Sequence, residues 1–224
     1  MSDQKTYFQA DILNRPLQKH GLLEEFNLPP KAIAFIRHYR RHIVAALCGV
    51  AVIIVGWSSW QQYRHKLDDR AAGRFAEAVA VVDPQKRQTM LEELLKEFGG
   101  TGSAVWARLE LGHLAVEAGR FDEALARYQE VLAGLSGTSP IRPLAQLAVA
   151  QTLEGKGSQN EALAAYQKLV ETKGFAWEAY LAMARIHERQ GAMKEAREMY
   201  NRVLPLEEVP APIKEQVKDR LARL

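Results

Sequence analysis

The sequence predicts an all-α protein with a single N-terminal transmembrane helix, an α-solenoid of repeated helix pairs and a C-terminal capping helix. Three observations support this fold class. Residues 43–60 form an uncharged and largely apolar run, IVAALCGVAVIIVGWSSW. Three later segments repeat one helical pattern with small residues at fixed positions. A short amphipathic segment follows the last of them, after a group of prolines.

The charge of the chain is concentrated near the apolar run. The 224 residues carry a net charge of +3, to which residues 1–66 contribute +5 and residues 67–224 contribute −2. Because the larger part has no basic stripe, nucleic acid is not a predicted partner. The single cysteine, Cys48, excludes a disulfide within the chain. Leu47 before it disfavours a lipoprotein acceptor, so we interpret Cys48 as a packed membrane thiol.

The apolar run has the length of a membrane span. As a helix it would measure about 27 Å, close to the roughly 30 Å hydrocarbon core of a bilayer. A cleaved signal peptide would need the whole of residues 1–42 as its leader, which is unusually long. Nothing else in the chain is apolar enough to surround a buried core helix on all sides. We therefore predict a retained membrane anchor at residues 43–60.

Basic residues flank the span unequally. Arg37, Arg40 and Arg41 precede it, whereas Asp68 and Asp69 dilute the basic residues that follow it. The positive charge before the span predicts that the N-terminus is cytoplasmic and that the C-terminal part lies on the other side of the membrane.

The segments before and within the span have further predicted roles. Residues 1–30 are expected to form a flexible cytoplasmic tail, with a docking peptide as the alternative that an apolar cluster at residues 22–26 keeps open. Residues 31–66 hold the juxtamembrane basic helix and the span, and Lys31–His42 is expected to run into the span as one helix. Small residues on one face of the span would let a partner helix approach, although such residues are common in spans. This helix-packing face consists of Ala45, Gly49, Val52 and Gly56.

Residues 67–102 are predicted to form a membrane-proximal helix pair. An apolar face with helical spacing continues over residues 61–82. Asp83 then suits an N-cap and Pro84 suits the first position of a second helix, which Gly99–Gly100 ends.

Three segments within residues 103–204 repeat the same pattern around a turn. Their sequences are GRFDEALARYQEVL from Gly119, GSQNEALAAYQKLV from Gly157 and GAMKEAREMYNRVL from Gly191. In each, Ala follows the glycine by five residues, Tyr follows the Ala by four, and a helical segment precedes the turn. This pattern, with glycines 38 and 34 residues apart, is typical of tetratricopeptide helix pairs. Gly permits the turn, Ala permits close helix approach, and Tyr fills the gap to the next repeat. Leu111–Gly112 fits the usual Leu–Gly of the first helix.

Residues 205–224 are predicted to cap this array. After three prolines, a helix can form to the end of the chain. Its apolar face would cover the otherwise exposed end of the last repeat. That face consists of Ile213, Val217, Leu221 and Leu224.

No pattern in the sequence indicates catalysis or cofactor binding. The six histidines are scattered, and no glycine-rich phosphate loop follows a strand. No Ser or Cys nucleophile has a base in a known motif. We therefore predict that the protein is not an enzyme and has no metal, cofactor or small-molecule substrate. The remaining prediction is that the protein binds other proteins. The binding surface would be the inner face of the solenoid, which is lined by the first helix of each pair.

Projecting the repeat onto the chain predicts the residues that line this groove. They are Trp106, Leu109, His113, Glu117, Leu147, Gln151, Glu154, Leu181, Arg185 and Glu188. For Leu109 and Leu147 a core position is the alternative. These residues are of mixed polarity and do not form the array of Lys, Asn and Arg that would clamp the carboxylate of a C-terminal peptide. A broader protein contact is therefore predicted.

The order of these features resembles the bacterial YfgM family, an ancillary subunit of the Sec translocon. The resemblance covers residues 31–224. It is carried by Gly56–Trp57–Ser58–Ser59–Trp60 at the end of the span and by the segments Leu94–Leu125 and Gly174–Tyr200. It implies a single-pass protein of the bacterial inner (plasma) membrane with periplasmic repeats. It also implies binding to Sec translocon subunits through the span and to a membrane-anchored periplasmic chaperone through the repeats, to assist secreted or envelope proteins.

One feature departs from that family. The tail before the span is longer than is usual, which leaves room for a further cytoplasmic contact. A scaffold subunit of another envelope complex, for cytochrome maturation or cell-wall assembly, is the alternative function, since anchored tetratricopeptide domains also occur there.

Overall fold

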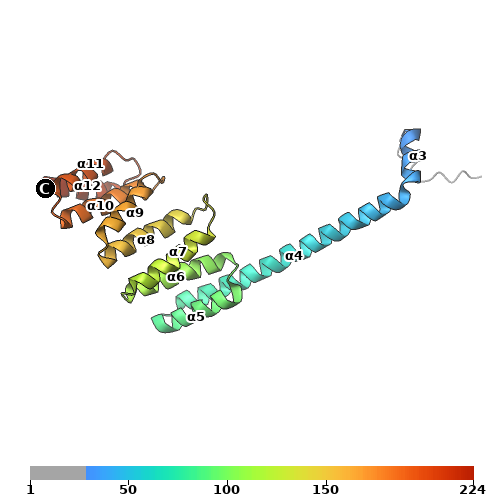
Figure 1. Ribbon diagram of the computed structural model, residues 1–224, viewed down its shortest axis with the longest axis horizontal. Helices are drawn as coiled ribbons and strands as arrows, with labels where there is room; N and C mark the ends of the chain where they lie inside the picture. Colours follow the sequence, from blue (N-terminus) through green and yellow to red (C-terminus); the bar gives the residue numbers. More distant parts are fainter. Residues whose placement is uncertain (1–28) are drawn as a thin grey trace, which may run out of the picture. The chain divides into compact units, whose positions relative to one another are not determined.

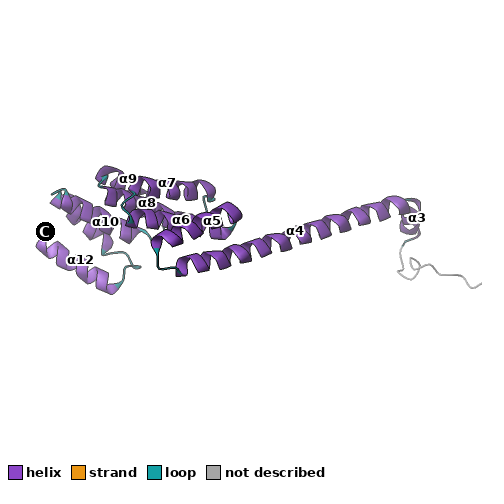
Figure 2. Cartoon of the chain, turned by 90° about the horizontal axis from the view of Figure 1, so that it is seen from below, coloured by secondary structure: helices purple, strands orange, loops and turns teal. Residues whose placement is uncertain are grey.

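The structure is a computed structural model that describes residues 29–224, and this part of the chain contains helices and no strand (Figures 1 and 2). The all-α prediction is confirmed. The predicted tail up to residue 28, including the apolar cluster at residues 22–26, lies outside the described residues. The helices are α3 (Pro30–His38), α4 (Arg40–Ala80), α5 (Pro84–Phe98), α6 (Gly102–Glu117), α7 (Phe121–Gly134), α8 (Arg142–Lys156), α9 (Gln159–Val170), α10 (Ala176–Arg189), α11 (Met193–Val203) and α12 (Ala211–Arg223).

The chain divides into two compact units, which meet within α4 between Gln62 and Tyr63. In the first unit the juxtamembrane segment differs from the single helix expected over Lys31–His42. Helix α3 ends at His38, and α4 begins only at Arg40. The break lies at Tyr39, whose φ of −96° and ψ of 13° leave the helical region. The Tyr39 ring packs against Phe35, with ring centroids 4.8 Å apart, and this aromatic contact accompanies the break.

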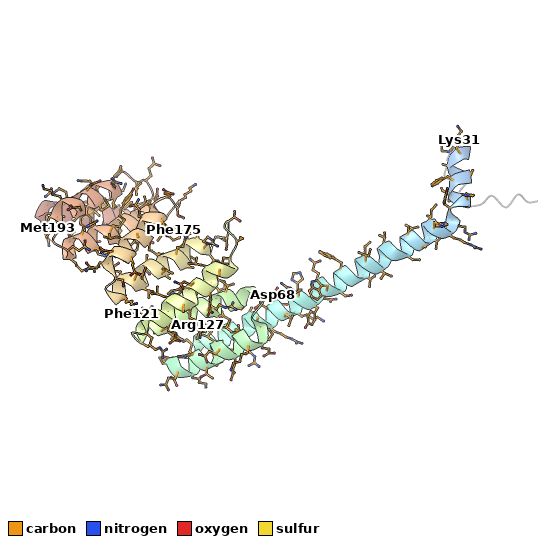
Figure 3. All side chains as sticks on the ribbon, viewed as in Figure 1. Lys31, Asp68, Phe121, Arg127, Phe175 and Met193 are labelled. Carbon is orange, nitrogen blue, oxygen red and sulfur yellow. The ribbon has the colours of Figure 1, made fainter. Side chains whose placement is uncertain are left out.

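The part of α4 that contains residues 43–60 is apolar and exposed. It is the one helix among the described residues that is long and apolar enough to cross a membrane, and none of its most apolar window is buried. Its side chains project away from the helix axis, and most of its large apolar side chains are more than half exposed (Figure 3). The four residues of the predicted helix-packing face are all exposed, and a Cβ added at Gly49 or Gly56 would meet nothing within 4 Å. Pairing of this face with another helix stays a prediction.

The second unit begins with the C-terminal part of α4. There Ala71 and Ala78 are fully buried in a cluster with leucines of α5 and α6. Asp83 caps α5 as expected, since its Oδ1 accepts a hydrogen bond of 3.0 Å from the backbone N–H of Gln85, and Pro84 is the first helical residue. The apolar N-terminal part of α4 is thus exposed, whereas its C-terminal part has a buried face.

Three helix pairs follow, α6 with α7, α8 with α9, and α10 with α11, and each pair also contacts the next. The turns within the pairs use Gly119, Gly157 and Gly191, whose φ angles of 71°, 85° and 74° lie in the left-handed region. The alanines five residues on are completely buried, and the tyrosines are buried as well. The predicted roles of Gly, Ala and Tyr in the repeat are confirmed.

Gly112 shows how closely the first pair packs. A Cβ at this position would lie 2.7 Å from Cζ and 2.9 Å from Cδ1 of Tyr128, and closer still to Cε1. The Leu–Gly of the first helix therefore provides the space that the ring of Tyr128 occupies.

Helix α12 ends the array. Val217 is 1% exposed and lies in the same buried cluster as Tyr200 and Val203 of α11. Three further apolar residues of the predicted face pack partly buried against this cluster: Ile213, Leu221 and Leu224. The predicted capping helix is therefore present and covers α11.

Candidate protein-binding groove

Equivalent residues of the three first helices, α6, α8 and α10, form one surface, which we call the first-helix face. Counted back from the turn glycine, the sixth residue is His113, Gln151 or Arg185 in the successive pairs. These three side chains are exposed. The third residue back is Val116 in the first pair and Glu in the other two, at 154 and 188. The predicted groove residues thus fall largely on equivalent positions.

The structure separates these residues by burial. Trp106 is 43% exposed, and Glu117 is also exposed. Leu109 is 5% exposed and belongs to the core cluster around Tyr128. Of its two predicted positions, groove or core, the structure therefore shows the core. The remaining predicted residues are half-buried: Leu147, Glu154, Leu181 and Glu188.

Glu154 lies at the centre of a polar network between the second and third pairs. Its carboxylate accepts a 2.8 Å hydrogen bond from the Tyr166 hydroxyl and a 2.7 Å hydrogen bond from Nη2 of Arg189. Nη2 of Arg185 lies 3.9 Å from the same carboxylate. The side chain of Glu154 is only 13% exposed, and a carboxylate that loses this much water needs such partners. The network joins α8, α9 and α10.

The tyrosine of this network is held neutral. Burial, followed by the hydrogen bond to and the charge of Glu154, raises the pKa of Tyr166 above its ordinary value. Tyr200 repeats the arrangement one pair later. There burial and the neighbouring Glu188 raise the pKa of the hydroxyl.

A first hollow lies where α12 takes the place of a further helix pair. It has a volume of about 90 Å³ and contains two of the predicted groove residues. Its lining consists of Leu181, Arg185, Tyr200, Gln216, Val217 and Arg220. Two arginines line this hollow, and of these Arg185 also lies 3.9 Å from the Glu154 carboxylate.

A larger hollow of about 270 Å³ lies between the first and second pairs. It contains three of the predicted groove residues, His113, Glu117 and Gln151. Its other lining residues are Val116, Tyr128, Ala148 and Thr152. The Tyr128 hydroxyl makes no hydrogen bond with any residue that the structure describes. Burial, and then the charge of Glu110, raises the pKa of this hydroxyl.

The acidic groups near this hollow differ in their pairing. Glu110 lies 3.0 Å from Nη1 of Arg87, and its second oxygen lies 3.7 Å from Nδ1 of His113. Glu117 has no ion pair within residues 29–224. Glu117 is therefore the one carboxylate among the described residues that line this hollow.

The other residues that line the two hollows, together with Tyr166 and Arg189 of the polar network, are not among the predicted groove residues. The sequence predicts for Tyr128 and Tyr166 only that they fill the gap between repeats, and it predicts no role for Arg189. The signal that could have found Arg189 is its place at the end of a first helix, next to the predicted Glu188. Among the described residues, no three His, Cys, Asp or Glu side chains gather as a metal site.

Comparison with known proteins agrees with this architecture. Residues 34–222 match the family described as tetratricopeptide repeat-like domain. Among solved structures, a putative kinesin light chain of Podosopora anserina with nearly identical TPR-like repeats is 20% identical with a TM-score of 0.51, covering 60% of this chain and 73% of that one. MamA (41-end) of Desulfovibrio magneticus RS-1 is 18% identical, with a TM-score of 0.51 and coverages of 61% and 75%. A tetratricopeptide repeat protein of Parabacteroides merdae ATCC 43184 is 18% identical, with a TM-score of 0.52 and coverages of 67% and 56%. No curated protein matches the sequence. At these identities the similar structures show the fold alone.

Proposed function

Because the chain belongs to the family of tetratricopeptide repeat-like domains, we propose that it is a membrane-anchored adaptor that binds other proteins through its first-helix face. The observation that carries the proposal is the composition of this face. It combines exposed charged residues with two hollows, and each hollow is lined by both exposed polar side chains and buried side chains. Such a mixed, hollowed surface fits a folded or extended polypeptide.

The anchor in this proposal is the apolar part of α4. A fully exposed apolar helix of this length is unfavourable in water and favourable in a bilayer. The basic residues before the span support a cytoplasmic N-terminus, with the repeats on the other side of the membrane. A reporter that is active only outside the cytoplasm, fused after Leu224, tests this orientation. Activity of the reporter is expected, and an inactive but stable fusion would reverse the proposed topology.

We further propose that the partners are Sec translocon subunits, contacted through the span, and a membrane-anchored periplasmic chaperone, contacted through the repeats. The support is the resemblance carried by the Gly-Trp-Ser-Ser-Trp sequence at residues 56–60 and by the repeat segments. In this role the protein would pass emerging secreted or envelope chains to folding factors at the bacterial inner membrane.

The test is purification of the full-length protein from its native membrane in a mild detergent, with mass spectrometry of the co-purifying proteins. The matched control is the same chain with residues 43–60 replaced by an unrelated apolar helix. Translocon subunits that appear only with the native span, together with a periplasmic chaperone, are the expected result. A different stable envelope complex would overturn the Sec assignment in favour of a scaffold role. The absence of any specific partner would overturn the adaptor proposal itself.

A further inference from the structure

We propose that the 270 Å³ hollow between the first and second pairs is a receptor for an arginine side chain of a partner protein. This inference rests on the proposed adaptor function and specifies the chemistry that one part of the first-helix face recognises. Its support comes from a comparison of two junctions within this chain, and from the charge and the tyrosine hydroxyl that line the hollow.

The junction between the second and third pairs supplies the comparison. There the protein supplies its own arginines to the half-buried carboxylate of Glu154: Arg189 donates a hydrogen bond to it from α10, and Nη2 of Arg185 lies 3.9 Å from it. The hydroxyl of Tyr166 donates to the same carboxylate. A guanidinium, a carboxylate and a tyrosine hydroxyl from three helices thus close this junction.

The junction between the first and second pairs has the tyrosine but no arginine. Gly155 stands at the position of Arg189, two residues before the turn glycine, and Gln151 stands at the position of Arg185. Val116 replaces the acidic residue. Gln151 and Val116 line the hollow, at the positions that Arg185 and Glu154 hold in the next junction. The cation that α8 does supply at this junction, Lys156, is paired with Asp122 and does not line the hollow.

The lining of the hollow fits a guanidinium on an apolar stem. Tyr128 is 1% exposed, and its hydroxyl has no partner among the residues that the structure describes, so an acceptor oxygen is available to an N–H donor. Glu117 provides a negative charge that is not neutralised by an ion pair within the described part of the chain. Val116 and Ala148 offer apolar surface to the methylene groups.

The other charged groups around the hollow do not oppose an incoming cation. Glu110, which precedes His113 by one turn of α6, already holds Arg87. His113 lies on the same helix and contacts Glu110 through Nδ1. An arginine matches this site better than a lysine, because its planar guanidinium carries several donors that can contact Tyr128 and Glu117 together.

The test uses the full-length protein in lipid nanodiscs, labelled with 3-fluorotyrosine and observed by fluorine NMR. The Tyr128 resonance is assigned with Tyr128→Phe, and the Tyr166 resonance serves as an internal control. The probe is the peptide acetyl-Gly-Ser-Arg-Ser-Gly-amide, and the matched peptide carries citrulline, which has the shape of arginine without its charge. The arginine peptide is expected to shift the Tyr128 resonance saturably and to leave Tyr166 unmoved, whereas the citrulline peptide shifts neither.

Surface variants give the sign of the interaction without disturbing the core. Glu117→Gln and Gln151→Arg should each weaken probe binding by about twofold to fivefold, and Gln151→Glu should strengthen it by a similar factor. Glu171→Gln removes an exposed charge away from the hollow and should change nothing. Equal effects of the two peptides, a Tyr128 resonance that does not move, or the same affinity in Gln151→Arg and Gln151→Glu would each overturn the inference.

The outcome is separable from the adaptor proposal. If partners co-purify with the full chain while the arginine probe fails to bind, the adaptor function stands and the arginine receptor is wrong. If the probe binds as expected and no partner co-purifies, the hollow has the inferred chemistry and the adaptor function is wrong.

Discussion

The repeat tyrosines have two roles at once. Tyr128, Tyr166 and Tyr200 are nearly completely buried, and each ring packs in a core cluster between helices. Their hydroxyls meet different partners: the Tyr166 hydroxyl binds Glu154, Tyr200 lies beside Glu188, and Tyr128 lines an open hollow. A residue that secures the stacking of the pairs therefore also sets the chemistry of the surface between them.

The contact between Gly112 and Tyr128 leads to a stability prediction. Gly112→Ala should lower the free energy of unfolding by about 1–3 kcal/mol, because the new methyl group overlaps a buried ring and forces a shift. Urea denaturation followed by circular dichroism measures this change. Gly73→Ala is the matched control: Gly73 lies in α4 with nothing within 4 Å of an added Cβ. Gly73→Ala should raise the free energy of unfolding by about 0.5–1 kcal/mol, because alanine loses less backbone conformational entropy than glycine when the helix forms. A neutral or stabilising Gly112→Ala would contradict the close packing.

Tyr166 should make stability dependent on alkaline pH. Its folded-state pKa is raised above the unfolded value of about 10, so its contribution is fully present below pH 10 and is lost as the pH rises further. Near that pH the free energy of unfolding should fall by up to about 1.4 kcal/mol per pH unit for this group. Tyr166→Phe should show a slope smaller by this amount between pH 10 and 11.

The same variant also loses a hydrogen bond. At pH 8, Tyr166→Phe should therefore be less stable by about 0.5–1.5 kcal/mol, while Arg189 continues to hold Glu154. Denaturant titrations of wild type and variant at pH 8, 10 and 11 measure both effects. Identical alkaline slopes for the two proteins would show that the tyrosine titrates normally.

Among the helices, α4 and α12 limit the array at its two ends. Helix α4 is apolar and exposed in its first part, yet it buries Ala71 and Ala78 against α5 and α6 in its last part. Helix α12 packs Val217 against the last pair and turns charged residues such as Lys218 to the solvent. A stack of helix pairs has an apolar surface at each open end, and these two helices cover it.

Helix α12 should be required for the stability of the last pair. Val217→Asp places a charge in a fully buried position and should uncouple α12 from α11. Because each pair contacts only its neighbours, hydrogen exchange should accelerate in α11 and α12 and stay unchanged in α5 and α6. Asp219→Asn, which changes a charge on the exposed side of the same helix, is the control and should leave exchange unaffected. Uniform acceleration through all pairs would instead show that the repeats unfold as one unit.

On the scale of the whole molecule, the chain consists of two units that differ in composition and in the exposure of their apolar side chains. The unit up to Gln62 contains the exposed apolar helix and the basic segment before it. The unit from Tyr63 to Leu224 contains the three core clusters and all the helix pairs. The net charge follows the same division, with its positive excess in residues 1–66.

This division predicts how the parts behave when separated. Residues 63–224 expressed alone should be soluble and helical and should unfold cooperatively in urea, because their cores do not depend on residues 1–62. The full-length chain should stay in the membrane pellet after an alkaline carbonate wash, because removal of its apolar helix from the bilayer is unfavourable. Release of the full chain by carbonate would contradict the anchor. An insoluble or unfolded fragment would contradict the independence of the second unit.

Periodicity and local turn chemistry made the fold predictable from the sequence. The Asp83–Pro84 helix start, the Gly119, Gly157 and Gly191 turns and the apolar face of the capping helix depend on residues close together in the chain. The break at Tyr39 was not predictable, because every residue between 31 and 42 is compatible with a helix.

The sequence by itself thus determined the helix pairs, their order, the cap and one apolar helix of membrane-spanning length. Only the tertiary structure decided which side chains meet on the first-helix face. Arg189 reaches Glu154 from 35 residues away, and the hollow at Tyr128 combines residues of α6, α7 and α8. The physical reason is that helical periodicity places a residue on a face, whereas the partner across a junction depends on how consecutive pairs pack and on the side chain that each pair extends toward its neighbour.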